Sequence, residues 1–415
     1  MERFHGLIGI AMLVAIAWGL SEHRGRVSAR LILAGVGVQF AVALTLLRVP
    51  GVSTGFAWLT EKFATLLEFA GSGAGFVFGD LSEGGYFFVT VVSIIIFFAS
   101  LMAILYHLGV TQRVIAAMAF VLRRTLGMSG VEALAASANV FVGQTEAPLV
   151  IKPYVPSLTR SQLMLVMTSG FATIAGSIFG LVVGTIAGED EAMRADVARH
   201  LLTASLISAP GAYVMAKTFI PETGEPPDER DVGLYSEQRA GNLLDAAARG
   251  ASDGMRLALN VVAMLIAFVS LIALVNWPIR GLGGLAGVEL SLERILGWVC
   301  SPVAWGMGIE RGDIGEIGQT LGTSVVATEL VAYARLGELA SPGEGGALIS
   351  ERSRTIATYG LCGFANLPSV GIQVGGLSVM APERRAEIAA LGLRAMLAGA
   401  MTCWMTACVA SVILD

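Results

Sequence analysis

The chain has 415 residues, of which 55% are hydrophobic and 14% charged, and its net charge at pH 7 is −5. Because soluble domains average about 25% charged residues, this composition excludes an ordinary soluble protein and indicates a membrane protein that crosses the bilayer several times. The small and dispersed net charge also argues against nucleic acid as a partner.

Apolar runs of about 20 residues, the length that crosses a bilayer, occur eight times along the chain. We therefore predict an all-α polytopic membrane protein with eight transmembrane helices, called spans one to eight below. They cover residues 5–20, 30–47, 86–109, 162–187, 200–220, 255–276, 354–380 and 390–413. Between spans two and three, residues 55–69 are amphipathic, with Glu61 and Lys62 on one side, and predict a helix that lies on the membrane surface.

Lysine and arginine gather in the segments that follow spans one, three, five and seven. Cytoplasmic loops carry an excess of these residues, so these four regions are expected in the cytoplasm and both termini outside it. The fifth span is followed by residues 221–236, an acidic and proline-rich stretch that reads as a soluble linker between two halves of the chain.

Two segments, residues 130–157 and 315–336, are too polar and too broken to cross a membrane. The first contains GQTEAPL at 143–149, in which Gly143 and Pro148 flank Glu146, and the second contains Glu329. An ionisable group at membrane depth is costly enough to indicate a functional site. Broken backbone survives there only where protein or a water-filled cavity supplies hydrogen bonds.

The two broken segments form part of an internal repeat. Each carries a Thr-Glu pair, and each is followed by a span with a similar motif, GFAT at 170–173 and GFAN at 363–366. The basic residues place the two segments on opposite sides of the membrane, so we predict two re-entrant helical hairpins in an inverted repeat. Secondary transporters have this arrangement, with their binding site near the midplane.

The polar side chains of these segments suggest a site for an uncharged polar solute. Glu146 and Glu329 provide carboxylates for a hydroxyl-rich ligand, a cation or a proton; alternatively, each caps a hairpin helix. Phe364 is placed to stack on a planar ring or to pack in the core. Directional donors and acceptors come from Gln144, Thr145, Asn366 and Ser369.

A second set of oxygens suggests a cation site. Asn139 and Thr173 carry side-chain oxygens, and helix breaks beside them would free the carbonyls of Val142 and Ile174. Unwound transporter helices bind Na⁺ through oxygens of this kind. The alternative is that Asn139 and Thr173 only form hydrogen bonds between helices.

The motifs GQTEAPL at 143–149, ELVAY at 329–333 and CGFAN at 362–366 resemble those of the concentrative nucleoside transporter family, and the resemblance extends over essentially the whole chain. It implies a homotrimer in which a mobile transport domain moves like an elevator against a fixed scaffold. The scaffold would comprise residues 1–110 and span six at 255–290. The transport domain would comprise residues 111–220 and 291–415, with a cytoplasmic linker at 221–254.

The resemblance also implies roles for individual residues. Those assigned to the nucleobase are Gln144, Thr145 and Glu146, with Gly143 and Ile178 lining the pocket. Those assigned to the sugar are Glu329, Asn366 and Ser369, with Phe364 against the nucleoside. Those assigned to sodium are Asn139, Thr173 and the carbonyls of Val142 and Ile174.

The sequence departs from the family pattern at four of its motif positions. Ser324 and Thr328 stand where the second hairpin of the family commonly has lysine and asparagine, and Pro368 replaces a small residue. The first two changes alter the polarity beside Glu329, and Pro368 would stiffen the break in span seven. Thr173 stands where sodium-coupled relatives often have serine, and the hydroxyl is kept.

The sequence therefore predicts a symporter of the bacterial inner membrane that imports nucleosides, with Na⁺ as the favoured coupling ion and no organic cofactor. Uridine and other pyrimidine nucleosides are the favoured substrates, and purines stay open. The first alternative is proton coupling through Glu146 or Glu329. A channel or an intramembrane enzyme is a more distant alternative. Against the enzyme, the sequence offers no nucleophile–base pair or metal triad.

Overall fold

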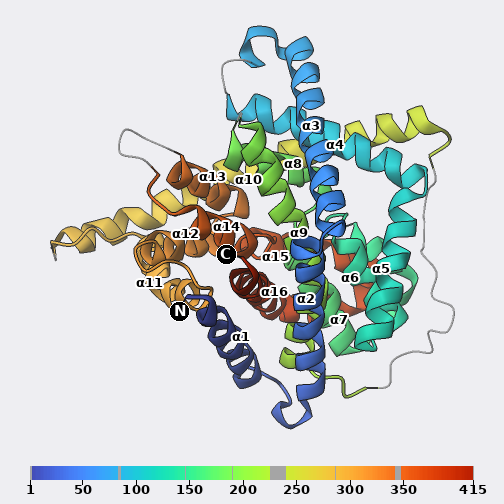
Figure 1. Ribbon diagram of the computed structural model, residues 1–415, viewed down its shortest axis with the longest axis vertical. Coiled ribbons are helices and arrows are strands. Elements are labelled where there is room, and N and C mark those ends of the chain that lie inside the picture. The colour runs from blue at the N-terminus through green and yellow to red at the C-terminus, as the bar shows by residue number, and fades with distance from the viewer. Residues whose placement is uncertain are drawn as a thin grey trace.

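The computed structural model describes residues 2–82, 86–144, 146–188, 190–224, 240–285, 287–341 and 347–414, and regular secondary structure within them is entirely helical (Figure 1). Thr145, residues 225–239 of the linker and residues 342–346 of the glycine-rich loop lie outside these ranges. The main helices are α1 (Glu2–Gly19), α2 (Ala29–Arg48), α3 (Val52–Phe78), α4 (Phe87–His107), α5 (Val110–Leu126), α6 (Gly130–Asn139), η3 (Ala147–Ser157), α7 (Arg160–Phe171), α8 (Gly176–Ala187), α9 (Glu191–Phe219), α10 (Leu243–Leu285), α11 (Leu292–Gly306), α12 (Ile314–Val326), α13 (Glu329–Ala340), α14 (Glu351–Gly360), α15 (Leu367–Met380) and α16 (Arg385–Ile413).

Each predicted span lies on one helix or on two helices separated by a break. Span four corresponds to α7 and α8, and span seven to α14 and α15. Within the described residues, five segments are long and apolar enough to cross a membrane: Ala29–Arg48, Phe88–His107, Arg160–Ala187, Leu243–Leu285 and Pro382–Ile413. The prediction of an all-α membrane protein is therefore confirmed.

The amphipathic helix predicted over 55–69 is longer than expected, because α3 covers Val52–Phe78. Gly51 (φ +83°) and Gly79 (φ +54°) bound it in conformations that favour glycine. No proline interrupts the stretch between them, so the glycines at 71, 73 and 75 weaken the helix without ending it. Helix α3 packs against α9, α4 and α2.

The repeat predicted from the motifs is visible in the order of the helices. One helix, a helical hairpin, a broken helix and a long helix follow one another from α5 to α9 and again from α11 to α16. The last helix of each set, α9 or α16, has 29 residues. Helix α10, with 43 residues, separates the two sets and projects beyond the helical body in Figure 1.

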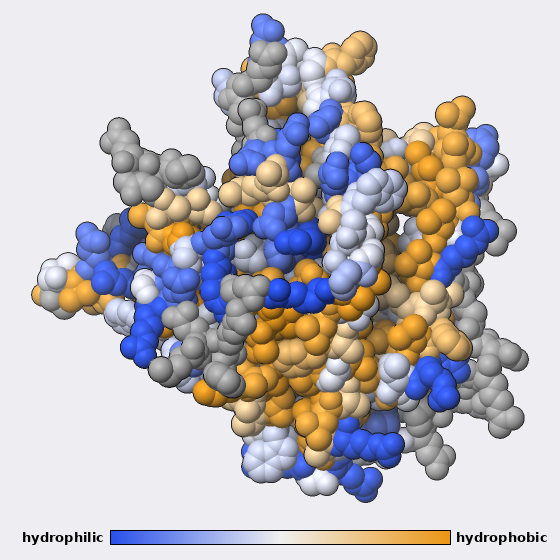
Figure 2. Space-filling view, viewed as in Figure 1, coloured by the Kyte–Doolittle hydropathy of each residue, from blue (hydrophilic) through white to orange (hydrophobic). Residues whose placement is uncertain are grey.

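Apolar side chains cover broad areas of the molecular surface (Figure 2). On α10 they include Ile266, which is 65% exposed, and Trp277, which is 78% exposed. In contrast, the C-terminal half of α16 is buried, and it packs against α1, α7, α9, α14 and α15. The broad apolar areas on the molecular surface, including those on α10, indicate contact with lipid or with another protein chain.

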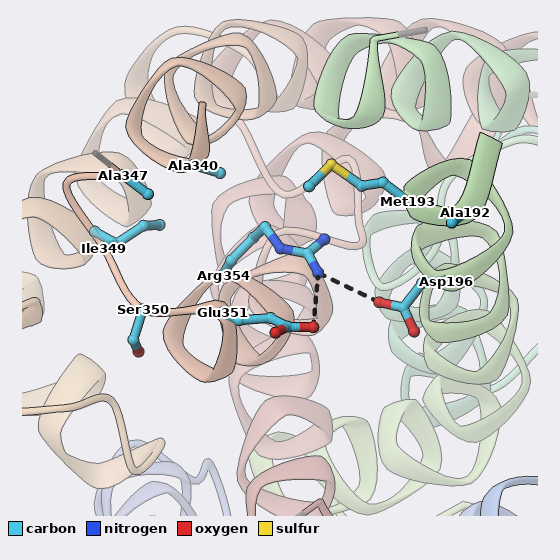
Figure 3. Close-up of a pocket in the computed structure, with 9 residues that line it drawn as sticks. All are labelled: Ala192, Met193, Asp196, Ala340, Ala347, Ile349, Ser350, Glu351 and Arg354. Carbon is cyan, nitrogen blue, oxygen red and sulfur yellow. Dashed lines mark hydrogen bonds and ion pairs between the residues drawn. The ribbon is translucent and has the colours of Figure 1, made fainter. Parts of the chain in front are cut away.

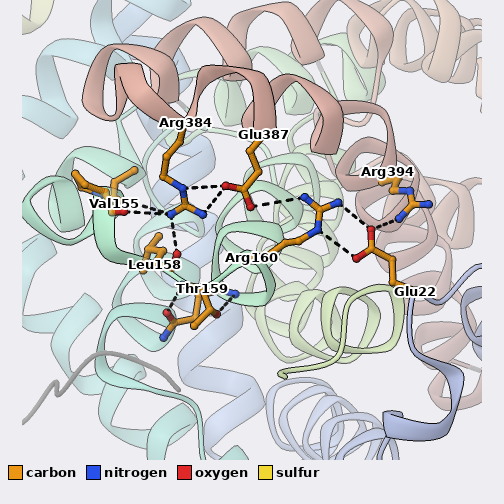
Figure 4. Close-up of polar contacts among 10 residues, drawn as sticks. Glu22, Val155, Leu158, Thr159, Arg160, Arg384, Glu387 and Arg394 are labelled. Carbon is orange, nitrogen blue, oxygen red and sulfur yellow. Dashed lines mark hydrogen bonds and ion pairs between the residues drawn. The ribbon is translucent and has the colours of Figure 1, made fainter. Parts of the chain in front are cut away.

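Ion pairs join three distant parts of the sequence (Figure 4). Glu22, in the loop between α1 and α2, accepts hydrogen bonds from Arg160 of α7 at 2.8 and 3.2 Å and from Arg394 of α16. The network continues from Arg160 to Glu387 at 3.6 Å and from Glu387 to Arg384 at 2.8 Å. The hydrogen bonds from Arg160 hold the pKa of Glu22 below its ordinary value, although partial burial opposes this shift.

Candidate functional site

The first hairpin consists of α6 and η3. Ser129 and Glu132 form a capping box at the start of α6, and every residue of this helix is buried. The chain then turns at Gly143, whose carbonyl accepts hydrogen bonds from the backbone N–H groups of Glu146 (3.1 Å) and Ala147 (2.9 Å). Prolines in η3 prevent a regular α-helix on the return path.

The breaks in spans four and seven lie against each other. Between α14 and α15, Gly363 approaches the Phe171 carbonyl so closely that a Cβ atom there would overlap it. Cys403 of α16 donates to carbonyls on both breaks, that of Ala172 at 3.6 Å and that of Cys362 at 3.4 Å. The first hairpin joins the same place, because the Gly176 N–H donates to the Phe141 carbonyl at 3.1 Å. The structure thus brings the two GFA motifs and the tip of the first hairpin together.

Two of the residues predicted for a cation, Asn139 and Thr173, come together at the break in span four. The Thr173 hydroxyl donates to the Asn139 carbonyl at 2.8 Å and approaches the Ser169 carbonyl at 3.3 Å. The Asn139 Oδ1 atom is buried and has no hydrogen-bond partner in the described part of the chain, and the Ser169 hydroxyl is in the same situation. Ile174 is buried and Val142 half-buried beside these residues. Unpartnered oxygens next to broken helices suit a hard monovalent cation.

The residues predicted for the sugar connect the second hairpin, α12 and α13, to span seven. Glu329 begins α13 and is 4% exposed, and the Asn366 amide donates to its Oε2 atom at 2.6 Å. The Asn366 Oδ1 atom in turn accepts from the Ser369 backbone N–H at 2.9 Å. Ser369 and Phe364 are also buried. A carboxylate at a helix N-terminus, held by an amide, can accept hydrogen bonds from hydroxyl groups.

Three of the departures from the family pattern have local explanations. Thr328 caps α13, with its hydroxyl accepting from the Val331 N–H at 3.4 Å. Ser324 donates to the Leu321 carbonyl at 2.8 Å near the end of α12. Pro368 lies in the first turn of α15, where a missing N–H costs little.

The residues predicted for the nucleobase differ in exposure. Gln144 is 7% exposed and Ile178 is 3% exposed. Glu146 is exposed, and its carboxylate folds back over Gly143 into the space that a Cβ atom there would occupy. Glu146 and Glu329 therefore have different surroundings, which the sequence alone did not distinguish. Thr145, as noted above, lies outside the described residues.

A separate pocket of about 490 Å³ lies between α9, α13 and α14 (Figure 3). Its buried cation, Arg354, pairs with Asp196 at 3.3 Å and with Glu351 at 3.8 Å. The pocket contains none of the predicted site residues. Because the carboxylates of Asp196 and Glu351 neutralise the Arg354 guanidinium, the charges in this pocket give no reason to expect an anionic ligand.

Sequence reasoning missed several buried polar groups, among them Lys217 and Gln373. Lys217, at the end of α9, pairs with Glu132 of the first hairpin at 2.5 Å and with Glu222 at 3.2 Å, whereas the sequence placed it only among the basic residues of the linker. Gln373 of α15 is 1% exposed. The signal for both was available, since each is a polar residue within or next to a predicted apolar span.

Family models match nearly the whole chain in three parts. Residues 8–81 match the N-terminus and residues 200–411 the C-terminus of Na⁺-dependent nucleoside transporters, and residues 88–189 match a nucleoside recognition domain. Relatives include the transporter YutK of Bacillus subtilis, 40% identical over 99% of this chain and 100% of its own length. Human solute carrier family 28 member 3 is 38% identical over 98% of this chain and 59% of its own length. The chain thus spans about 60% of the length of the vertebrate relatives.

Solved structures agree in fold. CNTnw in an inward-facing, substrate-bound state aligns with a TM-score of 0.89 at 37% identity, covering 100% of this chain and 98% of that one. A variant of CNTnw in an outward-facing state aligns with a TM-score of 0.91 at 36% identity, with the same coverage. From its motifs, its repeated helices and these similarities, the chain belongs to the family of Na⁺-dependent nucleoside transporters, which are transporters rather than enzymes.

Proposed function

We propose that this protein imports nucleosides across the bacterial inner membrane together with a cation, and that the cation is Na⁺. The observation that carries the substrate assignment is the hydrogen bond between the Asn366 amide and the Glu329 carboxylate, which joins the second hairpin to span seven. Glu329, Asn366 and Ser369 would bind the sugar hydroxyls. Gln144, Thr145 and Glu146 would bind the base, with Gly143, Ile178 and Phe364 around the nucleoside.

Competition against uptake of labelled uridine into proteoliposomes tests the substrate class. Unlabelled nucleosides should compete, whereas free uracil and free ribose, which each reach only one half of the proposed site, should compete weakly. Competition by uracil as strong as by uridine would contradict a role for Glu329 and Asn366 in sugar binding. The purine nucleoside adenosine, tested beside cytidine, would measure the expected preference for pyrimidines.

Sodium coupling is supported by the oxygens of Asn139 and Thr173, because the Asn139 Oδ1 atom has no hydrogen-bond partner among the residues that the structure describes. The carbonyls of Val142 and Ile174 would complete the site. When a cation binds there, it would hold the tip of the first hairpin to the break in span four, where Gln144 would meet the base. Ion binding would thereby favour substrate binding, which is the coupling that a symporter requires. In the rival mechanism, Glu146 or Glu329 carries a proton.

Thr173→Ala should weaken sodium activation of uptake, because it removes a hydroxyl oxygen from the proposed cation site. We expect the sodium concentration for half-maximal uptake to rise about three- to tenfold, the effect of losing roughly one hydrogen bond's worth of free energy. Uridine affinity at saturating sodium should change less. Thr173→Ser keeps the hydroxyl and is the matched control. A sodium activation curve identical to that of the wild type would exclude Thr173 from the ion site.

The elevator mechanism assigns spans one to three and span six to a trimeric scaffold, and both hairpins with spans four, five, seven and eight to the moving domain. The exposed apolar side chains of α10 support its contact with lipid and with neighbouring subunits. Eight spans, two re-entrant hairpins and both termini outside complete this topology. In it, the ion pairs of Figure 4 lie on the cytoplasmic side and cross from the scaffold loop at Glu22 to the moving domain.

Glu22→Gln should loosen this crossing contact and increase the population of a second conformation about two- to fivefold, because exposed ion pairs contribute up to about 1 kcal/mol. Spin labels at Gly25→Cys in the proposed scaffold and Glu383→Cys in the proposed moving domain would report the distance between the two domains. All four natural cysteines are buried and should stay unlabelled. Asp245→Asn breaks an exposed ion pair with Arg249 inside α10 and is the control. An unchanged distance distribution would show that Glu22 does not restrain the domains.

The increase in the second conformation that Glu22→Gln causes should not depend on pH between about 5.5 and 8. The pKa of Glu22 is lowered in the folded protein, so its stabilising contribution is complete above the ordinary glutamate pKa of 4.5. That contribution would be lost only as the pH falls through the lowered value.

A further inference from the structure

Gln373 is a buried amide in the apolar helix that begins with the proposed sugar-binding residues. It lies four residues beyond Ser369 and therefore on the same face of α15. Its side chain is 1% exposed. Burial of an amide in such a helix is costly unless its polar atoms find partners, so Gln373 requires an explanation.

The structure determines which end of this amide is free. The Nε2 atom lies 3.0 Å from the Met167 carbonyl of α7. Because a carbonyl can only accept a hydrogen bond, the nitrogen must face it and the oxygen must point elsewhere. The Oε1 atom is buried without a hydrogen-bond partner among the residues described. Gln373 thus presents an unused acceptor.

The Gln373 amide lies beside Gln144, the residue proposed to meet the base. Gly170 separates the two side chains: a Cβ atom on it would overlap Gln373 Nε2 and would lie 3.1 Å from Gln144 Cβ. The Gln144 Oε1 atom is also buried and without a partner in the described ranges. Helix α15 packs against η3 and α7, so Gln373 lies where the first hairpin, span four and span seven meet.

We propose that Gln373 is a specificity-determining residue whose Oε1 atom accepts a hydrogen bond from an N–H group of the nucleobase. This inference rests on the proposed nucleoside transport and extends it to base selection. An acceptor left unpaired on binding costs free energy, so bases that offer no N–H donor bind less well. The substrates selected are nucleosides with an amino or ring N–H group on the base.

Two pairs of nucleosides isolate this contact. Adenosine carries a single amino group as the N–H donor of its base, and purine riboside lacks it. Cytidine and its analogue without the 4-amino group form the second pair. Each would compete with labelled uridine for uptake by the full-length protein in proteoliposomes. The wild type should bind the amino member of each pair more tightly than the other member.

Gln373→Met should reduce this preference about three- to tenfold, the value of one hydrogen bond, by weakening the amino nucleosides. The affinities of the two analogues should stay the same or improve. If Gln373→Met does not assemble, Gln373→Leu replaces it with a side chain of similar volume.

Gln39→Met is the matched control. Gln39 is likewise buried, donates to a backbone carbonyl (that of Ile207, at 2.9 Å) and has a buried Oε1 atom without a partner in the described residues, but it lies on α2. Its replacement should leave the preference unchanged.

The outcomes separate this inference from the proposed function. If uridine uptake persists, either of two results for Gln373→Met would overturn the role of Gln373 in base selection. One is an equal loss of affinity for all four nucleosides, and the other is an unchanged preference for the amino member of each pair. Failure of adenosine and cytidine to compete in the wild type, together with no saturable uridine uptake, would instead overturn nucleoside transport itself.

Discussion

Replacing Glu329 with glutamine should abolish most nucleoside uptake. The carboxylate is buried at the start of α13 and is held by the Asn366 amide, which leaves it as the charged acceptor for the sugar hydroxyls. A hydrogen bond to a charged group contributes about 1.5–3 kcal/mol, so the apparent affinity for uridine should fall about ten- to a hundredfold. Initial rates of uptake at several uridine concentrations would measure this change.

Glu338→Gln is the control for this experiment, since Glu338 is exposed on the same helix. It should leave uptake unchanged. If Glu329→Gln transports uridine with wild-type rate and affinity, Glu329 does not bind the sugar. The affinities of 2′-deoxyuridine and 3′-deoxyuridine relative to uridine would identify the hydroxyl that Glu329 binds. The analogue that lacks this hydroxyl should lose more affinity in the wild type than in the variant.

Gly363→Ala should strongly destabilise the folded protein. The added Cβ atom would overlap the backbone carbonyl of Phe171 and would lie 2.6 Å from Cys403 Sγ. Overpacking costs about 1–3 kcal/mol even where side chains can adjust, and a carbonyl at a helix break has little freedom to move. The melting temperature of the detergent-solubilised protein should fall by several degrees, and uptake should be lost.

Gly371→Ala provides the comparison, because Gly371 lies on α15 with open space where its Cβ atom would be. Alanine is favoured over glycine in a helix, so this variant should be at least as stable as the wild type. A melting temperature for Gly363→Ala equal to that of Gly371→Ala would contradict the close crossing of the two breaks.

The positions of the helix breaks could be predicted because their causes are local. Gly143 and Pro148 interrupt the first hairpin, and the GFAT and GFAN motifs mark the breaks that follow α7 and α14. Hydrophobic runs located all eight spans, but α9 begins at Glu191, well before the predicted start of span five, and α10 (Leu243–Leu285) extends beyond both predicted ends of span six. Helix α3 was underestimated because its second half, with three glycines, has weak helix propensity and weak amphipathicity, whereas its packing on α9 and α4 comes from elsewhere in the chain.

The partners of the site residues could be predicted less well, because they are set by tertiary contacts. The sequence indicated Asn366 and Glu329 as polar site residues. It did not indicate that the Asn366 amide donates a hydrogen bond to the Glu329 carboxylate. Similarly, Gln373 was hidden within an apolar run, and its proximity to Gln144 depends on the absence of a side chain at Gly170. The contact of Glu22 with Arg160 and Arg394 joins residues that are distant in sequence.

The most direct test of the proposed symport is uptake of radiolabelled uridine into proteoliposomes at constant pH, with and without an inward sodium gradient. We expect accumulation above equilibrium only when the sodium gradient is present, and its loss when sodium is equal on both sides. Accumulation that follows a proton gradient and ignores sodium would contradict the cation site at Asn139 and Thr173 and would move the coupling to Glu146 or Glu329.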